Sequence, residues 1–300
     1  MSNEFEKIIN DKIIKIEKIN IGYSREVYRI NDELILKIIK NEKLENDTKK
    51  EVDFYNKYHL PFSPKIIKYD FSKTIIPYLY FIEENVSGEL LMNKWKYLSK
   101  NEKEIIIKQI LNKLDSIHKI DDLSYPVDDL SAEYDRYLKT IVESNILNED
   151  KIKYLKELKE IIPYLIKDKQ KCLIHGDFHF NNVIIDKDNE CKIIDFERVK
   201  NSYLEREYDP LNRMVRNPNS LINNNTKVVE DRNDFNTIMD SIFEYYKYNN
   251  QDDFKNMLLL FDCINSLMWL PKYPDYDLYH DVLFNKSKKL TRIWYNNNRW

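Results

Sequence analysis

Apolar and polar residues alternate in short runs over the first 84 positions, a pattern typical of half-buried strands. This alternation predicts strands within residues 13–40, with Asn31 and Asp32 forming the turn between the last two of them. Two more runs predict strands at residues 65–70 and 78–84. We therefore expect the start of the chain to be rich in β-structure.

Helical spacing of apolar residues marks other segments of the chain. This spacing predicts one helix inside the strand-rich region, at residues 46–59. Asn46 or Asp47 is placed to cap its first turn. Beyond Gly88 the helical period dominates. The further helices expected there are residues 100–119, 130–145 and 149–168.

Three short apolar runs interrupt the helical region, each the length of a strand, at residues 171–175, 181–186 and 190–196. From about residue 205 the pattern is again mostly helical. These patterns predict an α+β architecture with two lobes. We expect a small β-rich lobe over residues 1–84, a hinge at 85–88 and a larger, mainly helical lobe over 89–300.

The composition narrows the class of protein. The chain has 48 basic and 51 acidic residues, and its net charge of −3 gives no general attraction to nucleic acid or to an anionic membrane. No apolar run approaches the roughly 18 residues that a membrane-spanning helix needs. Three separated cysteines without a CxxC pair indicate neither a metal site nor a redox site. We expect a cytoplasmic protein with neither nucleic-acid nor membrane partners.

Glycine is scarce, since Gly22, Gly88 and Gly176 are the only three in the sequence. Average usage would give about 21 in a chain of this length. Biased codon usage explains such a depletion. The alternative is that glycine remains where positive φ or close backbone approach excludes other residues.

The segment His175–Asn182, HGDFHFNN, places a carboxylate, Asp177, and an amide, Asn182, in the loop between two predicted strands. A second carboxylate, Asp195, ends the next predicted hairpin. Oxygen ligands of this kind suit Mg²⁺, which takes few protein ligands together with substrate phosphates. Phosphoryl transfer combines metal ions of this kind with a carboxylate that accepts the proton of an attacking hydroxyl.

In these motifs the chain resembles the aminoglycoside phosphotransferase and choline kinase families, which are relatives of the protein kinases. Their catalytic loop has the pattern H-G-D-x-x-x-x-N and their metal-binding turn the pattern I-D-[FW], and both occur here at the expected spacing. The resemblance implies a two-lobed protein-kinase-like fold. It also implies that Asp177 is the catalytic base or the carboxylate that orients the acceptor hydroxyl, that Asn182 and Asp195 bind Mg²⁺, and that His175 has a structural role in the loop.

Kinase-like enzymes also have a strand lysine for the α- and β-phosphates of the nucleotide, paired with a glutamate on the next helix. By resemblance, the lysine is Lys37, whose two apolar neighbours point to the opposite face of the strand. Its expected partner is Glu51, in the first half of the following helix. Glu42 and Glu45 compete for this role, but both precede the predicted helix.

The nucleotide-binding loop and the hinge are less distinctive. The loop INIGYSREVYRI has a single glycine, Gly22, and the hydroxyl of Ser24 is expected to hold a phosphate. In the hinge, the resemblance places the C=O of Glu84 and the N–H of Val86 against the purine. Glu83 then stands where the families usually have an apolar residue, so the choice between ATP and GTP stays open.

The acceptor is expected to bind in the last third of the chain. Asp209 matches the start of a D-P-x-x-D stretch that braces the active site in these families, whereas Arg213 replaces the second aspartate. Carboxylates suit a polyamine such as an aminoglycoside, and aromatic faces suit a quaternary ammonium such as choline. A solvated acidic turn over core tyrosines is the alternative. An acidic patch over residues 121–129 either borders the same site or is an ordinary loop. The acceptor candidates are Asp209, Asp262, Trp269, Asp275 and Tyr276.

Together these features predict an enzyme that transfers the γ-phosphate of ATP or GTP to a hydroxyl of a small cationic molecule. An aminoglycoside is the leading acceptor, which would make the protein an antibiotic-resistance enzyme. A choline, ethanolamine or other small-metabolite kinase is the second hypothesis. A non-catalytic nucleotide-binding module is the third, and it predicts loss of Asp177, Asn182, Asp195 or Lys37, all of which are present.

Overall fold

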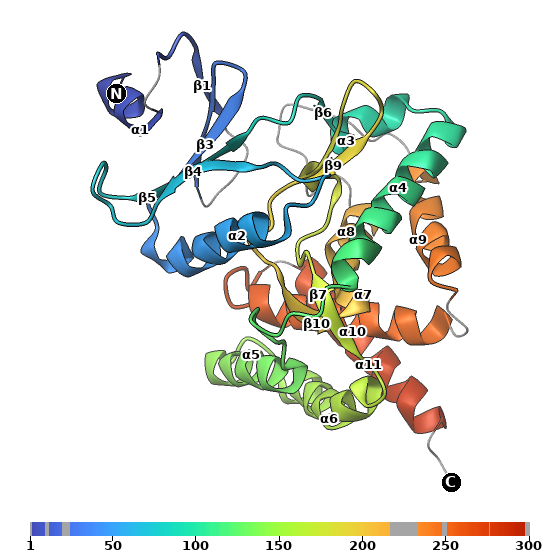
Figure 1. Cartoon of the computed structure of the whole chain (residues 1–300). Coiled ribbons are helices and arrows are strands. Elements are labelled where there is room, and N and C mark those ends of the chain that lie inside the picture. The colour runs from blue at the N-terminus through green and yellow to red at the C-terminus, as the bar shows by residue number, and fades with distance from the viewer. Residues whose placement is uncertain are drawn as a thin grey trace. The chain divides into compact units, whose positions relative to one another are not determined.

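The structure is a computed structural model that describes residues 2–9, 12–19, 25–216, 233–247, 251–275 and 277–297 (Figure 1). These residues fall into two compact units. The first unit runs to Asp115 and also contains His175–Val199, while the second contains Ser116–Ile174 and the described residues from Lys200 onward. The first carries most of the strands and the second most of the helices, which confirms the predicted α+β class.

A five-stranded antiparallel sheet lies in the first unit, with strand order β1-β2-β3-β5-β4 (Figure 1). Asn31 and Asp32 turn the chain between β2 and β3 with φ of 51° and 58°, left-handed values that Asn and Asp tolerate. The strands predicted in this region are confirmed. Their bounds are Ile16–Ile19 (β1), Glu26–Ile30 (β2), Leu34–Ile39 (β3), Ile66–Asp70 (β4) and Leu79–Glu84 (β5).

The helix α2, Glu45–Tyr58, confirms the predicted helix between β3 and β4, but neither Asn46 nor Asp47 caps it. A short 3₁₀ turn, Glu42–Leu44, leads directly into the helix. Asn41 caps that turn by accepting a hydrogen bond from one of its backbone N–H groups. The prediction of the cap was wrong because helical turns begin at Glu42, earlier in the chain than the spacing of apolar residues indicates.

The two faces of the sheet bury different side chains. Leu36 and Ile38 of β3 join an apolar cluster with the helix α1, Ser2–Ile9. On the opposite face, strand residues pack with Val52 of α2. Because side chains alternate across a strand, Lys37 lies on the face that α2 covers.

The rest of the first unit is built on a three-stranded antiparallel sheet of order β6-β8-β9. Strands β8 and β9 confirm two of the three later predicted strands, and α4 confirms the first predicted helix beyond Gly88. Strand β6 has only two residues, too few to show a period. The bounds are Glu89–Leu90 (β6), Leu91–Lys94 (α3), Lys100–His118 (α4, which ends in the second unit), Val183–Ile185 (β8) and Cys191–Ile193 (β9), with 3₁₀ turns at Trp95–Tyr97 and Phe180–Asn182.

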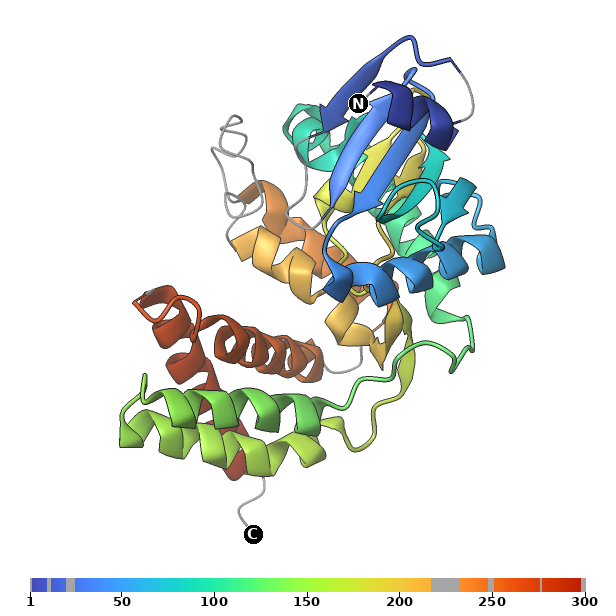
Figure 2. The same ribbon diagram turned by 90° about the vertical axis from the view of Figure 1, so that its left-hand side faces the viewer.

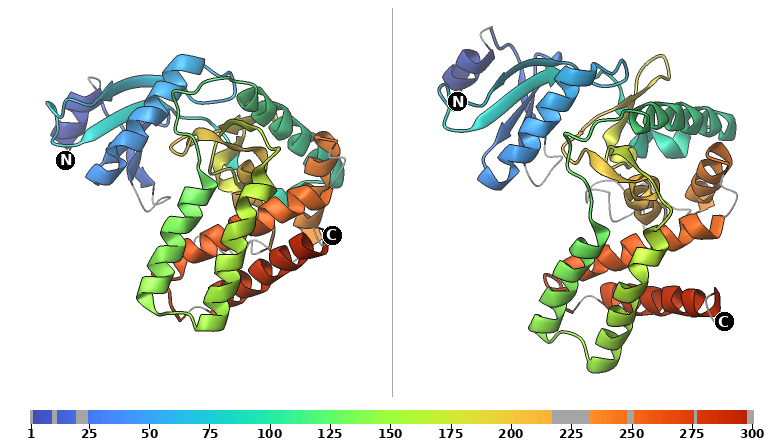
Figure 3. Two further views of the ribbon diagram at one scale, coloured as in Figure 1. Left: turned by 90° about the horizontal axis from the view of Figure 1, so that it is seen from below. Right: turned by 60° about the horizontal axis from the view of Figure 1, so that its bottom comes forward.

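The second unit is mainly helical. Helices α5, α6, α10 and α11 pack around a shared apolar core that includes Tyr134, Leu158, Phe261 and Leu290 (Figure 2). Figure 3 shows α5 and α6 running side by side as an antiparallel pair. The bounds of the helices are Leu130–Ser144 (α5), Glu149–Ile166 (α6), Leu204–Glu207 (α7), Asp209–Arg216 (α8), Asn233–Tyr245 (α9), Gln251–Trp269 (α10) and Asp277–Asn297 (α11).

A two-stranded antiparallel sheet, β7 (Lys171–Ile174) with β10 (Lys200–Tyr203), completes the second unit. Strand β7 was predicted, whereas the polar sequence of β10 gave no apolar signal. Asn201 of β10 is nevertheless buried, because its amide donates to the C=O of Asp122 at 2.8 Å. None of the helices that the structure describes is both long enough and apolar enough to cross a membrane.

Candidate functional site

The catalytic-loop motif begins directly after β7, and His175 is its buried support. The His175 Nε2 donates to the C=O of Ile194 at 2.9 Å, and its Nδ1 accepts the backbone N–H of Asp177 at 3.3 Å. One ring nitrogen thus ties the loop to the chain just after β9, and the other holds the Asp177 backbone. This geometry agrees with the structural role that the resemblance implies for His175.

Two of the three glycines lie where no side chain fits. Gly176 has a φ of +82°, and a Cβ there would lie 2.2 Å from the backbone oxygen of Arg198. A Cβ on Gly88 would lie 2.4 Å from the backbone oxygen of Ile185. These close approaches support selective retention of glycine at both positions. Gly22 lies outside the described residues.

Asp177 and Asn182 meet within the same loop. The Asn182 side-chain nitrogen donates to the C=O of Asp177 at 2.9 Å, so the amide oxygen is the group left to face a ligand. The Asp177 carboxylate keeps 29% of its side-chain surface exposed, with Arg198 Nε at 3.5 Å. The loop therefore presents one accessible carboxylate and one oriented amide oxygen.

Asp195 follows β9 and occupies an unusual backbone conformation for a residue with a side chain. Its φ is +69°, and its N–H donates to the hydroxyl of Tyr55 on α2 at 3.0 Å. Its side chain is 36% exposed, and one carboxylate oxygen lies 4.0 Å from Lys37 Nζ. Left-handed backbone at such a residue costs free energy and is concentrated at functional sites.

Lys37 lies between two buried carboxylates. Its Nζ is 3.2 Å from Glu51 Oε1, as the resemblance predicts, and 3.1 Å from Glu83 Oε1. Burial alone would lower the pKa of Lys37, but Glu51, Glu83 and Asp195 outweigh burial and raise it. Burial, partly opposed by Lys37, raises the pKa of Glu83 to about 7. Glu83, which departs from the family pattern, is thus a second partner of the lysine.

Arg25 is a member of this site that sequence reasoning missed. Its guanidinium, 5% exposed, pairs with Glu51 and lies 3.2 Å from Glu197 and 3.9 Å from Asp195. Its place beside Ser24 in the predicted phosphate loop was the available signal, but an arginine is unremarkable in a chain so rich in charge. We call the following group the nucleotide-site cluster: Arg25, Lys37, Glu51, Glu83, Asp195 and Glu197.

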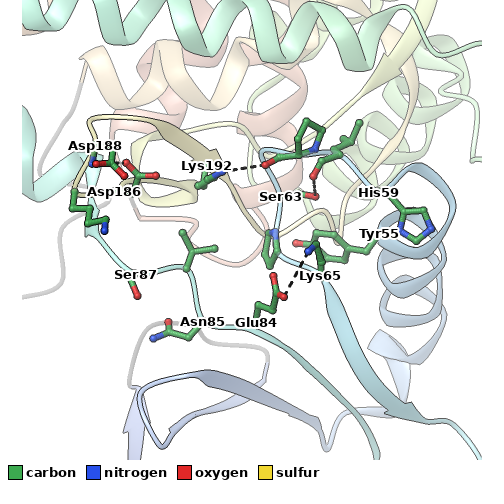
Figure 4. A pocket seen from close by; sticks show the side chains of 15 residues that line it. Tyr55, His59, Ser63, Lys65, Glu84, Asn85, Ser87, Asp186, Asp188 and Lys192 are labelled. Atoms are coloured by element: carbon green, nitrogen blue, oxygen red, sulfur yellow. Dashed lines mark hydrogen bonds and ion pairs between the residues drawn. The ribbon is translucent and has the colours of Figure 1, made fainter.

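A cavity of about 380 Å³ in the first unit brings several predicted residues together. Lys37, Asn182 and Asp195 line it along with the hinge residues Glu84 and Val86. The same two hinge residues also line a second cavity, of about 410 Å³. Figure 4 shows this second cavity and the ion pair between Lys65 and Glu84 at 3.9 Å. The hinge therefore borders two cavities, and only the first contains the motif residues.

Ser24 lies outside the described residues.

The acceptor candidates lie in the second unit, where two of them are neutralised internally. Asp262 is 3% exposed and pairs with both Arg216 and Lys286. Asp209 accepts from the Asn265 amide at 2.7 Å and lies 3.3 Å from Arg213, the residue that replaces the second aspartate of the family pattern. We call the following group the helix cluster: Asp209, Arg213, Arg216, Asp262, Asn265 and Lys286.

The remaining acceptor candidates lie near the end of α10. Trp269 contacts the ammonium of Lys272, which lies 4.2 Å from the ring centroid, and its ring lies 6.0 Å from that of Tyr273. Asp275 is exposed. Tyr276 lies outside the described residues. Among the described residues, neither Trp269 nor Asp275 has a hydrogen bond or ion pair with the helix cluster.

A two-lobed α+β fold with a kinase-like catalytic loop defines a phosphotransferase. The model of the phosphotransferase enzyme family matches residues 15–206, which is more than half of the chain. The chain belongs to this family, as the resemblance predicted, and it is an enzyme. No curated protein sequence matches it.

Solved structures share the fold at low sequence identity. The ADP-bound aminoglycoside phosphotransferase APH(2'')-Ib has a TM-score of 0.70 at 16% identity, covering 96% of each chain. The GDP complex of aminoglycoside 2'-phosphotransferase-IIIa has a TM-score of 0.71 at 13% identity, covering 97% of each chain. A putative aminoglycoside phosphotransferase from Ralstonia eutropha has a TM-score of 0.69 at 11% identity, covering 98% of each chain. At identities this low, the structural similarity establishes the fold alone.

Proposed function

We propose that the enzyme transfers the γ-phosphate of a nucleoside triphosphate to a hydroxyl of a small cationic molecule. The observation that carries the proposal is the loop in which Asp177 and Asn182 are held together, with Asp195 next to Lys37 in the same unit. The nucleotides in the structures of the aminoglycoside phosphotransferases named above support a nucleotide co-substrate.

Asp177 is the proposed catalytic base. The acceptor oxygen attacks the γ-phosphorus, the bond from that phosphorus to the β–γ bridging oxygen breaks, and the nucleoside diphosphate leaves. The carboxylate of Asp177 receives the hydroxyl proton, a role that its 29% exposure allows. His175, bonded to the Asp177 backbone, positions this loop.

The residues present fit a Mg²⁺ ion that is shared with the substrate. Within the described residues, no cluster of three His, Cys, Asp or Glu side chains is placed to hold a metal alone. Mg²⁺ in phosphotransferases takes one or two protein oxygens and several from phosphates and water. Asn182 and Asp195 supply such oxygens, and the ion would neutralise charge on the phosphates.

The nucleotide is proposed to lie against the first of the two cavities. Lys37, positioned by Glu51, binds the α- and β-phosphates, and Ser24 holds a phosphate from the loop. The C=O of Glu84 and the N–H of Val86 bind the purine. In this proposal residues 1–84 bind the nucleotide, 85–88 form the hinge and 89–300 hold catalysis and acceptor, although residues 89–115 and 175–199 fall in the same compact unit as residues 1–84.

For the acceptor, we propose an aminoglycoside, because the chain shares its fold with aminoglycoside phosphotransferases. Choline, ethanolamine or another small metabolite is the second candidate, since Trp269 and Asp275 supply an aromatic side chain and an exposed carboxylate six positions apart in the sequence. Phosphorylation of an aminoglycoside would inactivate the antibiotic. We place this reaction in the cytoplasm, where nucleoside triphosphates are made.

A coupled assay for nucleoside diphosphate release tests the proposal. The purified chain is given ATP or GTP with Mg²⁺ and, in turn, aminoglycosides, choline, ethanolamine and sugar alcohols. We expect acceptor-dependent release with at least one aminoglycoside. Turnover confined to choline or ethanolamine would reject the aminoglycoside, and nucleotide binding without turnover on any acceptor would favour the non-catalytic module.

A further inference from the structure

Arg25 lies immediately before β2, at the end of the segment where the predicted phosphate loop falls. Its side chain is almost fully buried, between Glu51 on one side and Glu197 on the other. A second guanidinium nitrogen donates to the hydroxyl of Thr48 at 3.2 Å. A buried guanidinium without partners costs several kcal/mol, so these contacts explain why the side chain can remain charged inside the unit.

Arg25 and Lys37 are two cations that contact the same two carboxylates, Glu51 and Asp195. Each pairs with a different oxygen of Glu51, and they lie 3.9 Å and 4.0 Å from the same oxygen of Asp195. Both side chains line the cavity that contains Asn182. Arg25 therefore has the same access to a ligand near Asp195 that the proposed function gives to Lys37.

One donor of Arg25 is not used within the described residues. Its Nε is buried and has no hydrogen-bond partner there. A buried donor without an acceptor costs about 1–3 kcal/mol. A phosphate oxygen could therefore accept a hydrogen bond from this group without the loss of an existing one among the described residues.

We propose that Arg25 is a second phosphate-binding cation, which exchanges its contact with Glu197 for an oxygen of the terminal phosphates of a bound nucleoside triphosphate. This inference rests on the proposed function, and it adds a residue that the sequence motifs do not mark. The guanidinium fork matches phosphate oxygens as well as carboxylate oxygens, so the exchange preserves the type of hydrogen bond.

The charge of the site gives the exchange a physical reason. The nucleotide-site cluster contains four carboxylates and two cations, and Arg198 also lies 3.6 Å from Glu197, so Glu197 keeps a cationic partner when Arg25 turns away. If Asp195 bound a divalent cation, its carboxylate would no longer attract Arg25. The guanidinium then gains most by turning toward the phosphates, which bring the new negative charge.

Binding measurements on variants test this inference. Calorimetry would compare the imido analogue of ATP or GTP, whichever the wild-type chain binds, with the matching nucleoside, both with Mg²⁺. We expect Arg25→Met to weaken binding of the imido nucleotide by roughly 10- to 100-fold, the loss expected for a hydrogen bond to a charged group. Affinity for the nucleoside should stay within about twofold, because it has no phosphate.

Two further variants control for folding and for general charge loss. Arg25→Lys keeps the positive charge but loses the planar fork, so we expect an intermediate loss for the imido nucleotide alone. Arg136→Met on the exposed surface of α5 should change neither affinity. If circular dichroism shows that Arg25→Met is unfolded, the Arg25→Lys result decides.

The outcomes separate this inference from the proposed function. Suppose that Arg25→Met loses the same affinity for the nucleotide and the nucleoside, or loses affinity for neither. Either result would show that Arg25 has only a structural role. If Arg25→Met binds the imido nucleotide as tightly as the wild-type chain does, the inference about Arg25 is wrong but the proposed function still stands. A wild-type chain that binds no nucleotide at all would contradict both.

Discussion

The nucleotide-site cluster and the helix cluster both bury charged side chains, but they balance charge in opposite ways. In the nucleotide-site cluster four carboxylates face two cations, and Asp195 remains 36% exposed. In the helix cluster two carboxylates face three cations, and Asp262 is 3% exposed. The first cluster has more carboxylates than cations and leaves Asp195 accessible, whereas the second has more cations than carboxylates and keeps both carboxylates buried.

This difference teaches that buried charge alone does not identify a ligand site. A buried ion pair whose members satisfy each other is a packing feature with a small or negative net contribution to stability. A carboxylate with like-charged neighbours and solvent access is unfavourable until a cation binds. By that criterion Asp195 suits the metal-ligand role proposed for it, whereas Asp262 already has two internal partners.

The largest expected effect falls on the catalytic loop. Asp177→Asn keeps the shape of the side chain but removes the proton acceptor, so we expect turnover to fall by roughly 10³-fold. Nucleotide affinity should change little, because the amide still fits the loop. Steady-state kinetics and calorimetry measure the two quantities. Asp188→Asn, in an exposed turn, is the matched control, and near-normal turnover of Asp177→Asn would remove Asp177 from the mechanism.

The two clusters should respond differently to loss of one carboxylate. Asp262→Asn leaves Arg216 and Lys286 facing each other, so we expect a loss of about 2–3 kcal/mol in the free energy of unfolding. Asp195→Asn loses the attraction to Arg25 and Lys37 but also relieves repulsion from nearby carboxylates, so it should change stability by less than about 1 kcal/mol. It should instead weaken Mg²⁺-dependent nucleotide binding by about tenfold or more.

Urea denaturation and calorimetry give both readouts. Equal destabilisation by Asp262→Asn and Asp195→Asn would break the distinction between the clusters. Unchanged metal-dependent binding in Asp195→Asn would count against the proposed metal ligand.

Glu83 adds a pH dependence to the nucleotide-site cluster. Burial raises its pKa to about 7, above the value near 4.3 of an unfolded glutamate. Between these values the folded chain binds more protons than the unfolded chain, so the Glu83 contribution to stability falls as pH rises from about 4 to 7. We expect wild-type stability, measured relative to Glu83→Gln, to fall by the order of 2 kcal/mol between pH 5 and 8.

Urea denaturation of both proteins at pH 5, 6, 7 and 8 measures this trend. A difference that is constant across the series would mean that Glu83 titrates normally and stays paired with Lys37 throughout.

The smallest expected effect concerns the acidic patch at residues 121–129. The structure explains several of its members internally: Asp129 caps α5 by accepting the N–H of Ala132 at 3.0 Å, and Asp128 pairs with Lys200 at 3.1 Å. Asp129→Ala should cost about 1 kcal/mol in unfolding free energy. Its turnover should match the wild type, and a loss of acceptor affinity would instead place this patch at the acceptor site.

Much of the chain could be predicted from local patterns. The strands with clear alternation, the long amphipathic helices and the turn at Asn31 follow from the sequence because each pattern is complete within a few residues. The polar strand β10 and the two-residue β6 could not be predicted, because their conformation comes from pairing with distant strands. The helix cap was wrong for a related reason, since the 3₁₀ turn that precedes α2 has no apolar period.

By itself, the sequence determined the family, the motif at His175–Asn182 and the pairing of Lys37 with Glu51. These depend on residue types at short spacing or on one strand followed by one helix. The tertiary structure alone decided that Arg25 and Glu83 join that pair and that Asp262 is already neutralised. Electrostatic energy depends on distance and burial in three dimensions, and neither can be obtained from positions that lie tens of residues apart in the chain.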